Sequence, residues 1–591
     1  MSKKFTVLLA ILLVVSMVFA ACDSSATPES SAASSASEPA SSAASSSAPE
    51  TNTGGTTFTD GLSGVNELPF VESPVDFIIA TPYYPYIIDY DTNEQTVYIE
   101  EQTGINIVWD ILPEQGSDEK INLMFAAGTG LPDLFTSCNG TFTASMLATL
   151  GDQGLVAPLN DAIEKWKYNL ADLMEQYPNY LPQQTAPDGN VYSLSGMGRN
   201  EPNTYAQRFW INQKFMDALG ITKLPETTDE YYDYLVAVKN NDPNGNGKAD
   251  EIPLAAAPVN NGWFEQIDGF LMQPFVYMDA TNGNTAGGKR RIYLTDDGKV
   301  EYAPVQEGYR EALKYLNKLY NEGLMSTEVF TMTKEELRSL VEFEDAEILG
   351  SLPSGGPHEF ANTSGERRKD YVILPPLAGP DGTRQAYWNE YEGITIGAMV
   401  VPAASEKVDL AVKFIDYMLN EEMNMWGRYG VEGRDWQRPA EGVKAFDGGQ
   451  AQIDESIGNL TWGEPQNVYL AGRIPRWGKF GSHAAIDNGD PYNLEKVLWE
   501  AHLEYIPYKT NKHVPPLYYT ADEAREYNEL VNTLHQYVEL SLAEFVTGKR
   551  SVDTDWDAYV AECEKIGLPR IMEIHQAAFD RQWAETWKAT H

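Results

Sequence analysis

The sequence predicts an α/β protein built from two or more lobes around mostly parallel sheets. From Val75 onward, short apolar runs alternate with amphipathic helical segments, which is the pattern of stacked helix and sheet layers. The chain has 591 residues, of which 42% are hydrophobic and 11% aromatic. This apolar content is enough for large packed cores, and the length exceeds that of one compact domain.

The first part of this region alternates strands and helices. Residues 77–80 form a continuous apolar run that predicts a buried strand, and a turn-like Thr-Pro pair follows it. The next predicted elements are, in order, a helix over 97–104 ended by a glycine, a strand over 105–110, a helix over 119–127 and a short strand beginning at 133–135.

The C-terminus is strongly helical. Apolar residues recur at helical spacing over 527–545, and Gly548 supplies a stop signal. A second helix is predicted to begin near Thr554, with Asp557 as the acid of a capping box, and to end at Gly567. We interpret the apolar stripe as core packing rather than as a ligand site.

Residues 1–21 have the organisation of an export signal. Two lysines precede an uncharged apolar run, and small residues precede Cys22. The sequence Ala-Ala-Cys resembles a bacterial lipobox, although Phe19 stands where that pattern prefers leucine. An uncleaved membrane helix is the alternative, but the run is marginal for spanning about 30 Å of hydrocarbon. We expect cleavage before Cys22 and attachment of a lipid anchor to its thiol.

Residues 22–57 are rich in serine, alanine and proline. They show no apolar periodicity that could build a core, so they predict a disordered tether. A coil of this length lets the folded part stand roughly 30–40 Å from the membrane. A long serine-rich tether is typical of a Gram-positive surface protein on the outer face of the cell membrane.

Charge and cysteine content narrow the possible functions. The chain carries 43 basic and 86 acidic side chains, a formal net charge of −43, which disfavours nucleic-acid binding. Apart from Cys22, the cysteines are Cys138 and Cys563, which imply no disulfide framework. These two could pair across the lobes or remain separate buried thiols.

The segment 242–251 has the pattern of a calcium loop. Oxygen-bearing side chains occupy loop positions 1, 3, 5, 9 and 10, and a glycine occupies position 6. Pro253 stands where an EF-hand has its bidentate glutamate, so an acid at position 9 or 10 must replace it. A plain Asn/Gly turn is the alternative. The expected ligands of a structural calcium ion are Asp242, Asn244, Asn246, Asp250, Glu251 and, through its carbonyl, Lys248.

Four groups of segments carry a family resemblance. They are 98–104 with 119–124 and 130–135; 210–212 with 219–221 and 242–254; 393–397 with 401–402 and 409–419; and 545–549 with 556–559 and 578–581. Together they resemble the family 1 extracellular solute-binding lipoproteins, especially the branch that includes alginate oligosaccharide-binding proteins. The resemblance spans nearly the whole mature chain, and the family's calcium ligands match the loop residues named above.

The resemblance implies a two-lobed, periplasmic-binding-protein-like α/β fold of type II, with maltose-binding-type topology and a ligand cleft between the lobes. The first lobe is expected over 70–197 and 393–470, and the second over 198–392 and 471–588. Crossing segments are expected near 193–209 and 387–393. Such a protein, expected to be a monomer, captures a carbohydrate, here expected to be an oligosaccharide, and delivers it to the permease subunits of an ATP-binding-cassette (ABC) importer.

A sugar cleft combines aromatic rings, which stack on CH faces, with polar side chains that pair with hydroxyls. Such mixtures follow the first strand, follow the calcium loop, lie at the second crossing and surround Arg476. Each aromatic residue could instead serve lobe packing. The candidate ligand-binding residues are Tyr83, Tyr84, Trp263, Trp388, Tyr391, Glu392, Arg473 and Trp477.

Two other functions remain as alternatives. A surface enzyme that degrades polysaccharides would need converging carboxylates, or a tyrosine or histidine with a cation. The sequence has no nucleophile elbow and no His-x-x-x-His pair, so we expect no enzyme. A surface sugar sensor or adhesin on the same fold is the other alternative.

Overall fold

The computed structural model describes residues 61–113, 116–138, 140–258, 263, 265–279, 291–362, 365–391, 393–460, 464–478 and 480–590. The expected signal peptide, Cys22 and the tether lie outside the described residues, as does Glu392. Among the described helices, none is both long enough and apolar enough to cross a bilayer.

The first sheet contains the strands that the sequence predicts near the N-terminus. Its order is β2-β1-β3-β9. β1 pairs in parallel with β2 and β3, whereas β9 pairs antiparallel to β3 with Phe135 opposite Val400. β9 therefore brings a distant part of the chain back into the first lobe. The strands are β1 (Val75–Pro82), β2 (Ile105–Leu112), β3 (Leu134–Thr136) and β9 (Met399–Val400).

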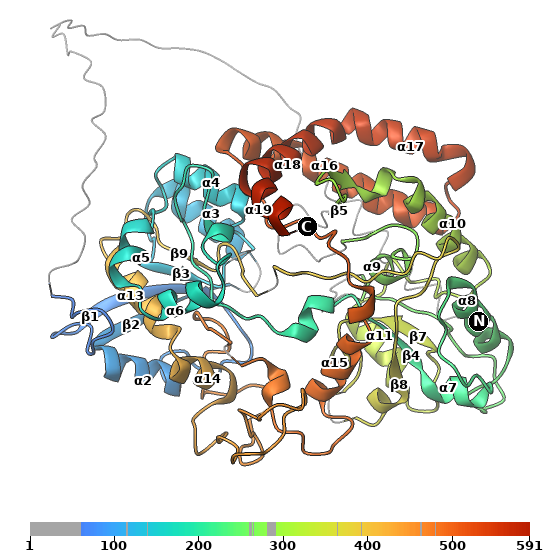
Figure 1. Cartoon of the computed structure of the whole chain (residues 1–591), viewed down its shortest axis with the longest axis horizontal. Coiled ribbons are helices and arrows are strands. Elements are labelled where there is room, and N and C mark those ends of the chain that lie inside the picture. Colours follow the sequence, from blue (N-terminus) through green and yellow to red (C-terminus); the bar gives the residue numbers. More distant parts are fainter. Residues whose placement is uncertain are drawn as a thin grey trace, which may run out of the picture. The chain divides into compact units, whose positions relative to one another are not determined.

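Helices cover both faces of this sheet (Figure 1). Phe77 and Ile79 of β1 face a core shared with α2, α5, α6 and α13, and Ala80 faces a core shared with α3 and α4. The helices are α2 (Glu94–Thr103), α3 (Ser117–Ala127), α4 (Ala144–Asp152), α5 (Asn160–Trp166), α6 (Asn169–Gln176), α13 (Val408–Met418) and α14 (Glu421–Tyr429). A 3₁₀ turn, Pro182–Gln184, follows α6.

The second lobe contains an antiparallel sheet, which corrects the expectation of mostly parallel sheets. β4 (Phe209–Asn212) is central and pairs antiparallel with β7 (Ser351–Pro353) and β8 (Tyr371–Leu374). All four residues of β4 are buried because cores lie on both faces. A fully buried run has the same appearance in either strand direction. A hairpin of β5 (Ile292–Leu294) and β6 (Val300–Tyr302) lies outside this sheet.

Most remaining helices belong to the second lobe. They are α7 (Gln213–Ala218), α8 (Thr228–Asn240), α9 (Asp268–Leu271), α10 (Glu307–Asn321), α11 (Lys334–Val341), α12 (Pro357–Phe360), α15 (Leu494–Leu503), α16 (Ala521–Val546), α17 (Val552–Ile566), α18 (Leu568–Gln582) and α19 (Ala584–Thr590). Short 3₁₀ helices occupy Glu201–Tyr205, Ala303–Val305, Arg367–Asp370, Ser482–Ala484 and Ile506–Tyr508.

The two predicted C-terminal helices are present, with one corrected start. α16 begins after Thr520, which forms a capping box with Glu523. α17 begins earlier than predicted, because the Ser551 hydroxyl, rather than that of Thr554, caps it by accepting the Thr554 N–H at 3.3 Å. The buried Val552 explains the earlier start, since it adds an apolar residue to the first turn.

The two internal cysteines remain apart. Cys138 and Cys563 are both buried free thiols. Cys138 packs in the core beneath α3 and α4, and Cys563 packs in the large core of the second lobe. The alternative of two separate thiols is therefore confirmed.

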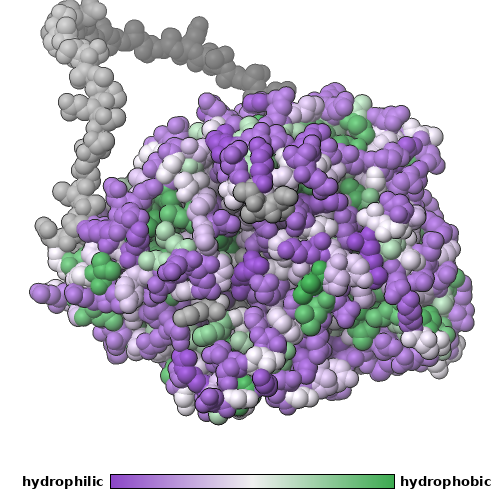
Figure 2. All heavy atoms as spheres, in the orientation of Figure 1, coloured by the Kyte–Doolittle hydropathy of each residue, from purple (hydrophilic) through white to green (hydrophobic). Residues whose placement is uncertain are grey.

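Three stretches of chain run side by side where the lobes join. The backbone N–H of Gly198 donates to the carbonyl of Gly393 at 2.9 Å. Met197 donates to the carbonyl of Arg476 at 2.8 Å, and Gly478 donates back to Met197 at 2.7 Å. The face shown in Figure 2 is mostly hydrophilic. We call the three hydrogen-bonded stretches, 194–199, 393–399 and 476–478, the junction.

Candidate functional site

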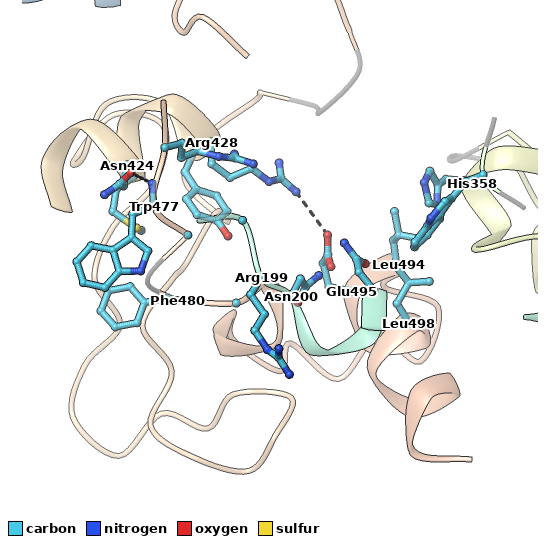
Figure 3. Close-up of a pocket in the computed structure, with 18 of the residues that line it drawn as sticks. Arg199, Asn200, His358, Asn424, Arg428, Trp477, Phe480, Leu494, Glu495 and Leu498 are labelled. Atoms are coloured by element: carbon cyan, nitrogen blue, oxygen red, sulfur yellow. Dashed lines mark hydrogen bonds and ion pairs between the residues drawn. The ribbon is translucent and has the colours of Figure 1, made fainter. Parts of the chain in front are cut away.

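A cavity of about 460 Å³ lies beside the junction, between α14 and α15 (Figure 3). This volume falls within the usual range of small-molecule sites. Its wall includes residues 198–200 of the first crossing segment, part of α14, the start of α15, and residues 476–478, 480 and 481. We call it the main cavity.

Aromatic rings stand at opposite ends of the main cavity. Trp477 and Phe480 lie at one end, near Asn424 of α14. Trp263 lies at the other end with His358, whose ring centroid is 5.9 Å from that of Trp263. Flat apolar rings at both ends of a polar cavity suit a ligand with apolar faces and a polar rim.

Trp263 is fixed by its surroundings. The backbone N–H of Trp263 donates to the buried carboxylate of Glu265 at 2.8 Å, and its backbone carbonyl accepts the N–H of Gly355 at 2.7 Å. The guanidinium of Arg208 lies 5.6 Å from the ring centroid. A methyl group on Gly355 would come within 2.2 Å of the indole, so only glycine allows the ring to rest there. Burial raises the pKa of Glu265.

An ion pair connects the two lobes across the main cavity. Arg428 of α14 lies 3.4 Å from the carboxylate of Glu495 of α15 (Figure 3). α14 packs with the first lobe, whereas α15 contributes Ala501 to a core of the second lobe. Both charged side chains are about one-fifth exposed, so water screens the pair only in part.

A second cavity of about 310 Å³ adjoins the main one and shares Gly198 and Arg476 with it. It is lined by the junction, the end of β3 and the stretch 472–476. Arg473 is one of the lining residues, and its guanidinium lies 4.3 Å from the ring centroid of Tyr84. We call this second cavity the recess.

The structure brings together some of the predicted ligand residues. Trp263, Trp477 and Arg476 line the main cavity, and Arg473 lines the recess with Tyr84 beneath its guanidinium. Tyr83 is 43% exposed and lines neither cavity.

The residues of the second crossing lie elsewhere. Trp388 and Tyr391 surround a depression that has no room for a ligand. The Trp388 ring carries the ammonium of Lys509 at 3.4 Å, and the Tyr391 ring packs on Trp583 at 5.4 Å. Both rings pack with the second-lobe core in this structure.

Sequence reasoning missed the polar residues on the helices. Asn424 and Arg428 occupy positions i and i+4 of α14, so they share one face of that helix. Glu495 and Leu498 of α15 line the opposite wall. The sequence signal that could have identified them is a pair of polar residues on the inward face of an amphipathic helix.

The segment 242–251 folds into a tight polar loop. The Asp242 carboxylate accepts the N–H groups of Asn246 at 3.1 Å and Gly247 at 2.8 Å. The amides of Asn244 and Asn246 donate to Asp250 at 3.0 and 3.1 Å. These bonds hold the side chains of Asp242, Asn244, Asn246 and Asp250 within one compact loop.

One carboxylate oxygen of Glu251 lacks a hydrogen-bond partner among the described residues. Its Oε1 is buried and has no hydrogen bond within the described structure. Burial, together with the nearby Asp242 and Asp250, raises its pKa. A cation would relieve this carboxylate, so the residues present fit calcium, although no group of three His, Cys, Asp or Glu side chains with metal-site spacing occurs among the described residues.

Two α/β lobes, with a cavity between them that has aromatic rings at both ends, are the architecture of a protein that captures a small ligand. A family comparison agrees with this class. The chain belongs to the family of bacterial extracellular solute-binding proteins, whose model matches residues 81–425.

Individual relatives are similar over most of the chain. The fructooligosaccharide ABC transporter substrate-binding protein FusA of Streptococcus pneumoniae is 27% identical over 512 residues, which are 84% of this chain and 88% of the relative. The polygalacturonan/rhamnogalacturonan-binding protein YtcQ of Bacillus subtilis is 23% identical over 365 residues, 60% of this chain and 64% of that protein.

Solved structures confirm the two-lobed fold. FusA in complex with kestose superposes with a TM-score of 0.69 at 23% identity, covering 88% of this chain and all of that one. An extracellular solute-binding protein from Bifidobacterium longum subsp. infantis gives a TM-score of 0.72 at 18% identity, covering 86% and 98%.

Proposed function

We propose that this protein captures an oligosaccharide outside the cell and delivers it to the permease subunits of an ABC importer. The observation that carries the proposal is the main cavity, with Trp477 at one end, Trp263 beside His358 at the other, and polar side chains between them. Rings at both ends can stack on two sugar units of one chain. The relative FusA, which is named for fructooligosaccharide, supports this substrate class.

The same cavity supports a capture mechanism without turnover. Ligand that contacts both walls favours the state in which α14 and α15 approach each other, and the Arg428–Glu495 pair adds to that state. The family and the relatives are binding proteins. We expect ligand recovered after incubation to be chemically intact; detection of cleaved product would favour a polysaccharide-degrading enzyme instead.

The test is isothermal titration calorimetry of the chain from about residue 58 with a panel of neutral and acidic oligosaccharides. Saturable binding with one ligand per chain, together with weaker binding by Trp477→Ala, is the expected result. A cooperatively folded protein that binds none of the saccharides would overturn the proposal.

We also propose the lobe boundaries that the sequence predicts, except that the first lobe would extend further toward the C-terminus. The first lobe would comprise 70–197 and 393–470, and the second 198–392 and 471–588. Ala471, Ile474 and Trp477 belong to the core of the first lobe, which supports extending that lobe through the junction.

Anchoring and assembly are further parts of the proposal. Residues 1–21 would direct export, Cys22 would carry the lipid, and residues 22–57 would tether the lobes to the outer face of the membrane. The protein would act as a monomer. Mass spectrometry of the protein from the membrane fraction tests for the lipid on Cys22. The variant Cys22→Ala should no longer be found in the membrane fraction.

We also propose that loop 242–251 binds a structural calcium ion. Asp242, Asn244, Asn246, Asp250 and Glu251 would provide side-chain oxygens, and Lys248 its carbonyl. Such an ion stabilises the loop by neutralising its carboxylates. Support comes from the unpaired oxygen of Glu251 and from a FusA structure named as an EF-hand mutant. Calcium should raise the melting temperature of the wild type but not of Asp250→Asn.

A further inference from the structure

The recess beside the main cavity differs from it in charge. Among the described residues that line the recess, Arg473 and Arg476 are basic and none is acidic. The main cavity, in contrast, includes Glu359, Glu421 and Glu495 among its described lining residues. The two spaces share Gly198 and Arg476 in their walls, so they adjoin each other.

Arg473 is surrounded by neutral groups. The side chains that interact electrostatically with its guanidinium are Tyr90, Tyr84 and Cys138. Burial raises the pKa of Tyr90 and of Cys138 to about 12, so both are uncharged at neutral pH. A buried guanidinium stays protonated, and its burial is costly until an anion approaches it.

The recess also offers a free hydroxyl group. Thr136 is 1% exposed, and its Oγ1 has no hydrogen-bond partner within the described structure. The neighbouring hydroxyls are already engaged: Ser137 donates to the carbonyl of Gly472 at 2.8 Å, and Ser195 donates to the carbonyl of Gly196 at 2.6 Å. A buried hydroxyl without a partner costs stability, which a ligand acceptor would recover.

The guanidinium of Arg473 lies over the ring of Tyr84, which restricts its movement. A planar guanidinium presents paired N–H donors whose spacing matches the two oxygens of a carboxylate. Hydroxyl groups of a neutral sugar can also accept these donors, but they leave the positive charge uncompensated. A carboxylate satisfies both the geometry and the charge.

We propose that the recess binds the carboxylate of an acidic sugar unit through Arg473, Arg476 and the hydroxyl of Thr136, while the adjoining units of the same oligosaccharide occupy the main cavity. The inference rests on the proposed function and narrows it to oligosaccharides that contain a uronic acid. Trp477, which follows Arg476 in the chain, would stack on the unit next to the acidic one.

The test compares ligands that differ only in charge. Galacturonate and glucuronate oligosaccharides are titrated into the protein beside their carboxyl-reduced, neutral counterparts of equal length and linkage. Sulfated oligosaccharides of similar length form a third arm. We expect the carboxylated ligands to bind at least about tenfold more tightly than the reduced ones, a preference that weakens as salt rises.

Three variants assign the preference to the recess. Arg473→Met should abolish the preference for carboxylated ligands, and Arg473→Lys should restore it only in part, because an ammonium lacks the paired donors. Thr136→Val should weaken carboxylate binding without lowering the melting temperature, since the hydroxyl has no partner to lose. Arg570→Met is the matched control, because Arg570 pairs with Glu526 and Glu573 on an exposed surface.

The outcomes separate this inference from the proposed function. Equal affinity for acidic and reduced ligands, or an unchanged preference in Arg473→Met, overturns the carboxylate site and leaves sugar capture standing. Tighter binding of the sulfated arm overturns the carboxylate assignment as well. Binding of no saccharide in any arm overturns both.

Discussion

Gly355 provides a way to displace Trp263 without removing its ring. A methyl group at this position would lie 2.2 Å from the indole, whereas ordinary contact begins at 3.4 Å, so the ring must retreat by about 1.2 Å. Arg208 and His358 flank the ring, which leaves the main cavity as the open direction. Gly355→Ala should therefore push the indole into the space that the ligand needs.

The expected loss follows from the stacking that the shift disrupts. An aromatic contact contributes about 1 kcal/mol beyond its buried area, and the partly filled cavity adds to the loss, so affinity should fall about tenfold. Titration calorimetry measures it with whichever oligosaccharide binds the wild type. Gly140→Ala is the control, because a methyl group there meets nothing within 4 Å. Undiminished affinity in Gly355→Ala would falsify the role of Trp263 as a ligand-contacting ring.

Two further predictions concern the charge pair and the thiols. Glu495→Gln removes the charge that faces Arg428 at 3.4 Å, so ligand should dissociate faster and bind up to about fivefold more weakly. Glu500→Gln, on the exposed side of α15, is the control and should bind like the wild type. Equal dissociation rates in the two variants would contradict a bridging role for the ion pair. Burial raises the pKa of Cys138 to about 12 and that of Cys563 to about 11. In a chain from about residue 58, we therefore expect neither thiol to react with Ellman's reagent at pH 8 until the protein unfolds. Rapid labelling of the native protein would refute this.

Local periodicity was sufficient for the N-terminal half of the first sheet. The apolar run 77–80 and the alternating run 105–110 became neighbouring parallel strands, because the helix between them ends at a glycine and returns the chain to the same edge. The direction of β4 was not accessible in this way. Its four residues are buried on both faces, and strand direction depends on partners more than 100 residues away.

The candidate site was likewise predicted only in part, because local sequence shows some of its residues and not others. Trp263 and Trp477 were found because each lies in a short loop with polar neighbours, a cluster visible in the sequence. Asn424 and Arg428 were missed because they lie on an amphipathic helix whose other residues, such as Met423, belong to the core. Trp388 has the same local chemistry as Trp477, yet its ring packs under Lys509, because stacking suits a lysine as well as a sugar.

The junction connects the proposed ligand-binding residues Arg476 and Trp477 directly to the proposed hinge of the first crossing segment. Gly196 approaches Arg476 so closely that a methyl group on it would lie 2.3 Å from the Arg476 carbonyl, and Met197 exchanges two hydrogen bonds with the stretch 476–478. Arg476 and Trp477 therefore cannot move without moving the first crossing segment. Ligand bound to these two side chains would pull directly on the first crossing segment. We therefore expect binding and closure to be coupled through the two backbone hydrogen bonds that Met197 makes with the stretch 476–478 rather than through a long path of side chains.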